Sequence, residues 1–419
     1  MTSLLAGIAA FGVYACMYAF RKPFTAAGYS NLQFAGIDYK IWLVIAQTIG
    51  YTISKFAGIR LISGMKHEQR AIVIVKLIIA AWIALLFFAL VPRPYNIIFL
   101  LLNGIPLGII YGLVFSYLEG RQSTEVLGAV LASSFIFASG FAQSAGKWVM
   151  SVWGVDQWWM PFLTGLIFLV PLMLFTWLLD KTPAPTTADI ESRTPRLPMN
   201  KKERKKFIST FLPGLVLLIT AYVLMTMIRD YRSNFAADIW MELGHGKDST
   251  VFTRSEIPST ILVLLVMSFL VLVRNNMKAF LINHLLILAG LLLIITSTVF
   301  FLEGMLSSFW WMTLTGMGLY MSYVPFNCML FERLIASFKY ISNAGFIIYV
   351  ADSFGYLGSN LILLLKNFGR LDISWTQFYV RMLFMGTAAG IFLVTLSAVY
   401  FSRKYKGYHP LIQSKHSYA

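Results

Sequence analysis

The sequence is poor in charged residues, cysteine and histidine for its length. Only 12% of its 419 residues are Asp, Glu, Lys or Arg, about half the share of a typical soluble protein. Its two cysteines, Cys16 and Cys328, lie in apolar segments, and its five histidines are scattered without metal-ligand spacing. No glycine-rich phosphate loop is present either. These absences argue against a soluble protein, a metal site and an ATP-driven pump, and we expect no cofactor.

Acidic residues are the scarcer charge, with 18 Asp and Glu against 34 Lys and Arg. The resulting formal charge of +16 could indicate a nucleic-acid partner. Most of the basic residues, however, stand in short loops between apolar runs. We therefore interpret them as signals of membrane topology and expect no nucleic-acid partner.

Long apolar segments dominate the sequence, and a membrane span needs about 20 such residues. The pattern predicts an all-α integral membrane protein with twelve transmembrane helices, over residues 3–34, 41–63, 71–92, 96–118, 126–150, 157–179, 209–240, 257–273, 279–301, 308–331, 343–365 and 375–402. The first and seventh segments are too long for one straight span, so we expect tilted or bent helices there.

One long polar segment, rich in Pro, Thr and charge, divides the spans into six plus six. It predicts an N-terminal lobe over 1–179, a cytoplasmic linker over 180–208, a C-terminal lobe over 209–402 and a cytoplasmic tail over 403–419. Nineteen of the 34 Lys and Arg residues lie on the side of the linker and both termini, and six lie in the opposite loops. The positive-inside rule then predicts cytoplasmic termini. Two of the predicted outer loops contain Lys40 and Arg93, and the other two are residues 241–256 and 366–374.

The two halves resemble each other. "VYACMYAFR" (13–21) and "AYVLMTMIR" (221–229) align without a gap, and each ends on an arginine in the first span of its half. "YLEGR" (117–121) and "LFERL" (330–334) both end a fourth span. Such a repeat is typical of a two-lobed transporter with its site between the lobes.

Basic residues outnumber acidic ones within the predicted spans. The nine basic residues are Arg21, Lys22, Lys55, Arg60, Lys76, Lys147, Arg229, Arg232 and Arg381, and the three acids are Asp230, Asp238 and Asp352. Buried cations are expensive unless water or an anion accompanies them. The planar donor fork of arginine matches a polyatomic anion such as phosphate, so one arginine from each lobe would form a clamp. The sequence predicts a small anionic substrate.

Several of these charges also have structural interpretations. Arg60, Lys76, Lys147 and Arg381 lie near predicted span ends, where long basic side chains reach the interface. Arg21 would only flank the membrane if its helix ended near Phe24, and would lie deeper if the helix continued to about Asn31; Lys22 is equally open. Lys55 lies in mid-span without an acid in its own span, which favours a functional role.

The other site hypotheses concern charge balance and gating. Asp352 could neutralise Arg229 or Arg232, or could carry protons, and Asp230 with Arg232 belongs to the same charge-balancing group. Tyr14, Tyr18 and Tyr222 could line the substrate cavity or simply pack. The charges at the inner ends of spans four and ten could form a cytoplasmic gate of salt bridges between the lobes, or could simply be solvated helix ends; they are Glu119, Arg121, Glu332 and Arg333.

At these residues the chain resembles the major facilitator superfamily, and within it the organophosphate:phosphate antiporters, the glycerol-3-phosphate and hexose-phosphate transporter group. "YACMYAFRKPF" fits that group's first-helix pattern, "YTISKF" its second-helix segment with a membrane lysine, "YVLMTMIR" its seventh-helix arginine, and "FGYLGS" (354–359) its eleventh helix. The resemblance implies two lobes that alternate access to a phosphate gripped by Arg21 and Arg229, with Lys55 as an added cation.

The sequence also departs from that group. The fifth span lacks the group's histidine and offers Ser139 and Gln143 instead, and the signature after span two is degraded to "SGMKHEQR". "YLEGRQSTEVLGA" and "ADSFGYLGSN" are similar to a bacterial family of unknown function in the same superfamily. The substrate range of the antiporters therefore does not transfer directly.

Three functions compete on this evidence. The leading one is secondary transport of an organic anion by a monomer in the bacterial inner membrane, by exchange or by proton symport. The second is a transporter-like anion sensor without net transport. The third, a membrane enzyme, lacks the reactive cluster that it would need, and we expect no enzymatic activity.

Overall fold

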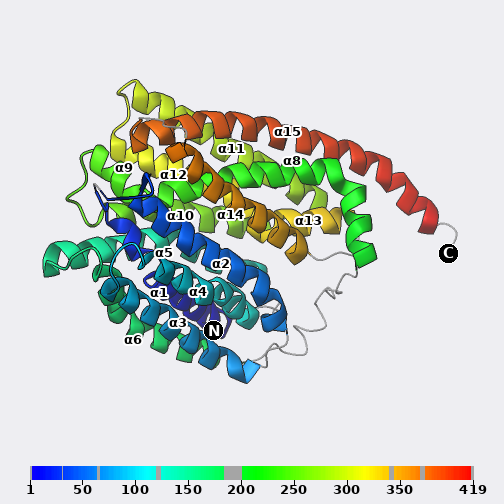
Figure 1. Cartoon of the computed structure of the whole chain (residues 1–419). Helices are drawn as coiled ribbons and strands as arrows, with labels where there is room; N and C mark the ends of the chain where they lie inside the picture. Colours follow the sequence, from blue (N-terminus) through cyan, green and yellow to red (C-terminus); the bar gives the residue numbers. More distant parts are fainter. Residues whose placement is uncertain are drawn as a thin grey trace. The chain divides into compact units, whose positions relative to one another are not determined.

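A computed structural model gives the structure of residues 2–30, 32–63, 67–118, 124–183, 201–338, 344–368 and 373–416. Helices dominate these residues (Figure 1). The twelve long ones are α1 (Thr2–Tyr18), α2 (Tyr39–Ser63), α3 (His67–Leu90), α4 (Ile97–Leu118), α5 (Thr124–Trp153), α6 (Met160–Asp180), α8 (Lys201–Asn234), α10 (Val251–Val271), α11 (Asn276–Leu302), α12 (Ser308–Cys328), α14 (Ala344–Phe368) and α15 (Trp375–His416).

Each long helix overlaps one predicted apolar segment. Eight of them, within the described residues, are long and apolar enough to cross a membrane by length and composition. The short elements are the 3-10 helix η1 (Pro23–Ala26), α9 (Ala236–Glu242), α13 (Leu330–Ser337), and a two-stranded antiparallel ribbon of β1 (Gln33–Phe34) and β2 (Ile37–Asp38) that pairs Gln33 with Asp38. This arrangement is that of an all-α, multi-pass membrane protein.

The first predicted span is wrong in its extent. The sequence predicts one long helix over 3–34, but α1 ends at Tyr18 and the chain continues through a turn into η1. Pro23 is the reason, because proline lacks the N–H donor that a continuing helix needs and fixes its own φ. The seventh span also divides, since α8 ends at Asn234 and α9 begins at Ala236.

The chain forms two compact units. Unit 1 consists of Met1–Arg193, Asp230–Leu264 and Asn360–Tyr379, and unit 2 consists of Thr194–Arg229, Leu265–Ser359 and Val380–Ala419. The division into lobes on either side of residues 180–208 stays a prediction.

In unit 1, α2 packs closely along α4 (Figure 1). A Cβ added at Gly104 of α4 would lie 2.3 Å from the backbone oxygen of Gln47, so the two backbones approach to a distance that only glycine permits. Helix α1 packs on α5 and α6, and η1 packs on α5 and α9. This packing places the non-helical segment after α1 in the interior of unit 1.

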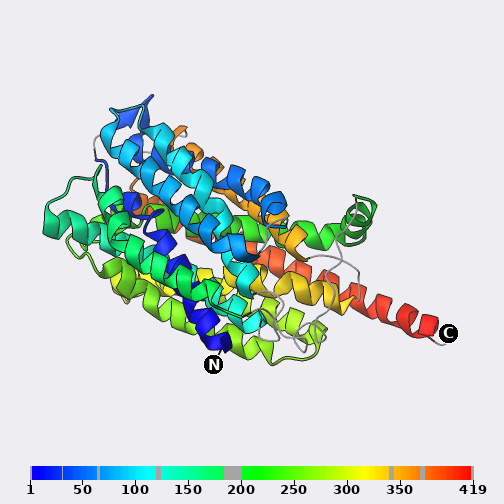
Figure 2. The same ribbon diagram turned by 90° about the horizontal axis from the view of Figure 1, so that it is seen from below.

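In unit 2, α11 packs on α12 and α13. Phe301 and Trp311 stack with their ring centroids 4.1 Å apart. Helix α15 is the longest helix, with 42 residues, and its C-terminal part extends past α11 and α12 (Figures 1 and 2). A helix of this length rises about 63 Å, roughly twice the hydrocarbon thickness of a bilayer, so part of it lies outside the membrane.

Candidate substrate-binding residues

Arg21 lies directly after the end of α1, in a buried non-helical stretch. The chain leaves the helix at Tyr18, so nearby carbonyl groups lose their helical partners. Asn103 Nδ2 donates to the carbonyl oxygen of Phe20 at 3.0 Å, and Gln47 Nε2 donates to that of Arg21 at 2.9 Å. Non-helical backbone is tolerated at membrane depth where protein groups satisfy it in this way. The break therefore determines where Arg21 points.

Two cations of unit 1 lie against a single tyrosine ring. The guanidinium carbon of Arg21 is 3.9 Å from the ring centroid of Tyr51 and 5.6 Å from that of Tyr18. Lys55 Nζ, one helical turn along α2, is 5.5 Å from the same Tyr51 ring. Cation–π contacts stabilise such cations over an aromatic face. The pair concentrates positive charge at this tyrosine ring.

Aromatic side chains surround this pair. Tyr14 makes edge contacts with Tyr18 and Tyr111, at centroid distances of 5.5 and 5.4 Å. Tyr14 and Tyr18 are among the sequence-predicted site residues, whereas Tyr51 and Tyr111 are not. Tyr51 stands four residues before Lys55 in "YTISKF", a spacing that puts both on one helix face and could have identified it.

Arg229 has a similar neighbour in unit 2. Its guanidinium carbon is 4.0 Å from the ring centroid of Tyr323 on α12. Tyr323 stacks on Tyr222 with centroids 5.1 Å apart and an interplanar angle of 22°. Each half of the chain thus holds the guanidinium of its first-span arginine over a tyrosine ring.

Asp352 is buried in unit 2 and is hydrogen-bonded to a tyrosine. The Tyr222 hydroxyl donates to Asp352 Oδ1 and lies 3.0 Å from the Tyr323 hydroxyl. The sequence analysis offered Arg229 or Arg232 as the partner of Asp352, or a proton-carrying role, and left the role of Tyr222 open. The hydroxyl pair connects Asp352 to the ring against which Arg229 lies, and both roles of Asp352 stay predictions.

Arg232 forms a buried ion pair with Glu256 of α10, and the two residues are 4% and 6% exposed. The sequence analysis assigned Glu256 to an outer loop over 241–256, which is wrong because α10 already begins at Val251. A Cβ added at Gly140 of α5 would lie 2.8 Å from Glu256 Cγ, so α5 presses on this pair. Arg232 is therefore neutralised locally and is a poor candidate for direct anion binding.

Lys22 is buried and points to the end of α8. Its Nζ donates to Ser233 Oγ at 2.9 Å and to Asn234 Oδ1 at 2.6 Å. Gln143 of α5 donates to the backbone oxygen of Ser233 at 2.7 Å, and Ser139 Oγ lies 2.9 Å from Ser233 Oγ. The two polar residues of the fifth predicted span thus bind the same turn as Lys22.

Lys40 is buried too, although the sequence analysis assigned it to an outer loop. Its Nζ is 2.6 Å from Asp238 Oδ2, in an ion pair whose side chains are 2% and 5% exposed, and it donates to the backbone oxygen of Thr25 at 2.9 Å. Asp238, which the sequence analysis placed in the seventh span, belongs to α9. The pair ties the start of α2 to α9.

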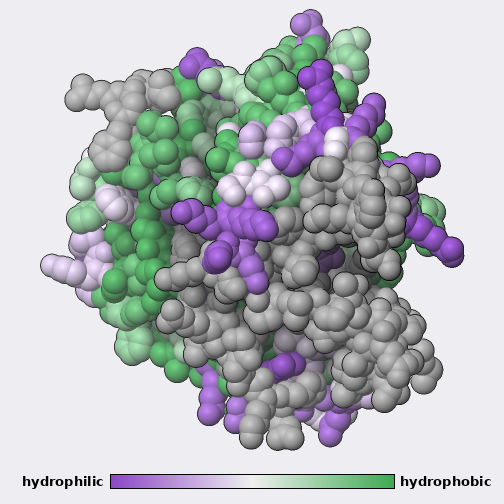
Figure 3. Space-filling view, turned by 90° about the vertical axis from the view of Figure 1, so that its right-hand side faces the viewer, coloured by the Kyte–Doolittle hydropathy of each residue, from purple (hydrophilic) through white to green (hydrophobic). Residues whose placement is uncertain are grey.

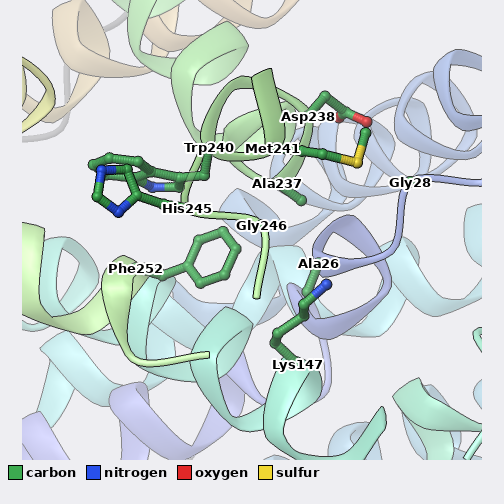
Figure 4. Close-up of a pocket in the computed structure, with 10 residues that line it drawn as sticks. All are labelled: Ala26, Gly28, Lys147, Ala237, Asp238, Trp240, Met241, His245, Gly246 and Phe252. Atoms are coloured by element: carbon green, nitrogen blue, oxygen red, sulfur yellow. The ribbon is translucent and has the colours of Figure 1, made fainter. Parts of the chain in front are cut away.

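A small cavity of about 40 Å³ lies beside this pair, lined by residues that include Lys147, Asp238 and His245 (Figure 4). It has room for only a few water molecules. Lys147 of α5 and Asp238 of α9 both border it. A phosphorylated metabolite does not fit, so this cavity is not the substrate site.

The predicted cytoplasmic gate is only partly described. Glu119 and Arg121 lie outside the described residues, and Glu332 and Arg333 lie on α13. Arg333 Nη1 donates to Asn276 Oδ1 at 2.9 Å, which ties α13 to the start of α11. The gate stays a prediction.

Asp230, which the sequence analysis placed in the charge-balancing group, follows Arg229 near the end of α8 and is half-buried.

Comparison with known proteins gives a family for the chain. Residues 23–404 match the model of a family described as "Family of unknown function (DUF5690)". The chain belongs to this family. No curated protein matches it in sequence.

Solved structures similar to this chain are transporters. A crystal structure of a D-xylose–proton symporter superposes with a TM-score of 0.62 at 12% identity, covering 94% of this chain and 96% of that one. A bacterial homologue of the human lysosomal transporter Spinster, inward-facing and unoccupied, gives 0.60 at 12% identity over 98% of both chains. The inward-open xylose transporter XylE from E. coli gives 0.59 at 15% identity over 93% and 94%. At these identities the likeness concerns the fold, and it confirms the predicted major facilitator architecture for this member of the family.

Proposed function

We propose that this protein is a secondary transporter that moves a small organic anion, either phosphate or a phosphorylated metabolite, by alternating access. The fold it shares with a D-xylose–proton symporter and with a Spinster homologue supports the transport activity. The excess of basic over acidic residues in its spans supports the charge of the substrate. We expect a monomer in the bacterial inner membrane with both termini in the cytoplasm.

The observation that carries the proposal is the matched setting of Arg21 and Arg229. Each arginine ends an aligned segment in its own half. Its guanidinium carbon lies 3.9 Å (Arg21) or 4.0 Å (Arg229) from the centroid of a tyrosine ring. Stacking orients the planar guanidinium and limits the entropy it loses when it binds an oxyanion. Phosphate oxygens accept such paired donors in a bidentate manner.

Substrate and lobe movement are coupled if the anion binds both arginines only in certain states. A ligand shifts a conformational equilibrium by its difference in affinity between the states. An anion that contacts Arg21 alone or Arg229 alone would bind more weakly than one that contacts both. Lys55, beside Arg21, would add attraction without a matching partner in the second half.

The contacts of Lys22 and Lys40 bear on the same movement. Lys22 binds Ser233 and Asn234, and Lys40 binds Asp238, so each joins a residue before the polar linker to one after it. With cytoplasmic termini, these contacts lie at the outer ends of the helices. We expect them to hold the outer side closed and to break when that side opens.

The coupling mode, exchange or proton symport, depends on Asp352. Its hydrogen bond to Tyr222 leads to the tyrosine under Arg229. A carboxyl so close to the anion-binding arginine can balance its charge when the substrate is absent. The same carboxyl would carry the proton if transport were proton-coupled.

The decisive experiment is uptake of labelled phosphate into proteoliposomes preloaded with unlabelled phosphate, followed by competition with glycerol phosphates and sugar phosphates. Saturable exchange that one competitor suppresses would support the proposal and identify the substrate. Binding of phosphate by folded protein without any flux would favour the anion sensor instead. Neither binding nor flux, with a folded sample, would exclude a phosphate-type substrate.

A further inference from the structure

The first turns of α8 form a basic segment that lies beyond the apolar part of the helix. α8 has 34 residues and would rise about 51 Å, against roughly 30 Å of hydrocarbon. The part of α8 that exceeds the hydrocarbon thickness lies at its N-terminal end, in "KKERKKFISTFLP". The side chains of Lys202, Lys205 and Lys206 are exposed there, and the described residues place no carboxylate within ion-pair distance of them.

This segment turns away from the rest of α8 near its N-terminal end (Figures 1 and 2). Pro213 stands inside the helix, and proline kinks a helix by removing a backbone hydrogen bond. The segment before Pro213 is amphipathic. Phe207 and Phe211 are buried, while Ile208 and Leu212 are 37% and 48% exposed. Exposed lysines next to exposed aliphatic residues are typical of a helix that lies in the membrane interface.

Aromatic contacts hold the segment in place within unit 2. Phe211 packs on Phe207 at 5.2 Å and on Phe338 of α13 at 4.9 Å, measured between centroids. Phe338 in turn packs on Phe401 of α15 at 6.2 Å. Lys404 of α15 places its Nζ 5.4 Å from the Phe211 ring. The basic start of α8 and the basic part of α15 are therefore neighbours.

The charges gathered at these helix ends are almost all positive. The exposed basic side chains are Lys202, Arg204, Lys205 and Lys206 of α8, Arg403 and Lys406 of α15, and Arg274 and Lys278 at the start of α11. Phe280 of α11 packs on Phe401 at 5.3 Å, which brings the start of α11 to the same place. Hydrophilic side chains gather among apolar surface in the view that faces this end of α8 and α15 (Figure 3). We call this set of residues the basic collar.

We propose that the basic collar binds the phosphate headgroups of anionic lipids in the cytoplasmic leaflet, with Ile208 and Leu212 inserted at the level of the acyl chains. The occupant is a lipid because the charged surface adjoins exposed aliphatic side chains on the same segment of α8, which a soluble anion would leave in water. Juxtamembrane lysines attract an anionic leaflet at about 1 kcal/mol each. This binding is separate from transport of the substrate.

The test uses the purified protein in neutral detergent and measures the binding of fluorescent phosphatidylglycerol, with zwitterionic phosphatidylcholine as the probe without net charge. We expect the wild type to prefer phosphatidylglycerol. The triple variant Lys202→Gln, Lys205→Gln, Lys206→Gln should bind phosphatidylglycerol at least about tenfold more weakly than the wild type. A matched triple variant, Arg93→Gln, Lys247→Gln, Arg254→Gln, removes the same charge elsewhere and should retain it. Replacement of the three lysines by arginine should also preserve binding, which separates loss of charge from misfolding.

Three results would overturn the proposal. The first is equal binding of both lipids by the wild type, and the second is equal behaviour of the two glutamine triple variants. The third is displacement of the fluorescent lipid by soluble glycerol phosphate as effectively as by unlabelled phosphatidylglycerol, which would make the collar a site for free phosphate. Phosphate exchange measured on the same variants should be unchanged in a neutral bilayer, so failure here is distinguishable from failure of the transport proposal.

Discussion

Arg21 and Arg229 occupy matching places in the sequence but different local structures. Arg21 lies in a break after α1 whose carbonyls are satisfied by Asn103 and Gln47, and it shares its tyrosine with a second cation. Arg229 lies inside the continuous helix α8, and its tyrosine leads to a carboxylate. The first region accumulates positive charge and the second balances it.

Under the proposed function we expect the two regions to have different roles. A region with two cations on one ring would contribute mainly to attraction of the anion. A region that connects an arginine to a buried aspartate through two tyrosine hydroxyls can respond to the presence or absence of that anion. Mutations that affect one region should therefore not reproduce the effects of mutations in the other.

The largest effect is expected for the arginines themselves. Arg21→Lys and Arg229→Lys keep the charge but lose the planar fork, so each should weaken phosphate binding about 100-fold, as expected for a lost charge-assisted bidentate contact. Isothermal titration on folded protein measures this directly. Arg254→Lys, at a solvent-exposed ion pair, is the matched control and should bind normally. Wild-type affinity in both arginine variants would exclude the clamp.

The break after α1 should be the more fragile of the two regions. Asn103→Ala removes the side-chain donor of the buried carbonyl oxygen of Phe20, which follows the end of α1, and such a loss costs about 1–3 kcal/mol. We expect a lower free energy of unfolding together with weaker phosphate binding, because the position of Arg21 depends on the break. Unchanged binding in a destabilised variant would show that Arg21 is oriented independently.

Lys55→Gln should have a moderate effect that has no counterpart around Arg229. Removal of one of two neighbouring cations should weaken phosphate binding about tenfold, a cost of about 1.4 kcal/mol, while the protein keeps its stability. Lys76→Gln, which removes a lysine from α3, serves as the control. If Lys55→Gln binds phosphate like the wild type, Lys55 does not belong to the site.

Asp352→Asn should lower stability only slightly. The amide oxygen can still accept the hydrogen bond from Tyr222, so only the charge-assisted part is lost, about 1 kcal/mol. If Asp352 balances Arg229, thermal unfolding should move to lower temperature while the pH profile of exchange keeps its shape. If exchange instead loses its pH dependence at unchanged stability, Asp352 carries the proton.

Several site features could not be predicted because they depend on where a helix begins or ends. Glu256 and Lys40 looked like loop residues, and both form buried ion pairs, because α10 and α2 begin a few residues earlier than apolar content alone indicates. Tyr323 escaped notice because apolar segments contain many aromatic residues, and only packing identifies the ring that meets an arginine. Tyr51 could have been identified from its spacing to Lys55, but only packing shows that Arg21 meets its ring.

The fold class follows from the amino-acid sequence alone, since runs of about 20 apolar residues can satisfy their backbone hydrogen bonds in a bilayer only as helices. The sequence also shows which residues carry the unusual charges, because a basic residue in an apolar run is costly wherever it points. The partners of those charges become known only from the folded structure. A partner such as Glu256 for Arg232 or Tyr222 for Asp352 lies 24 or 130 residues away in the chain, and helix packing alone brings the two side chains together.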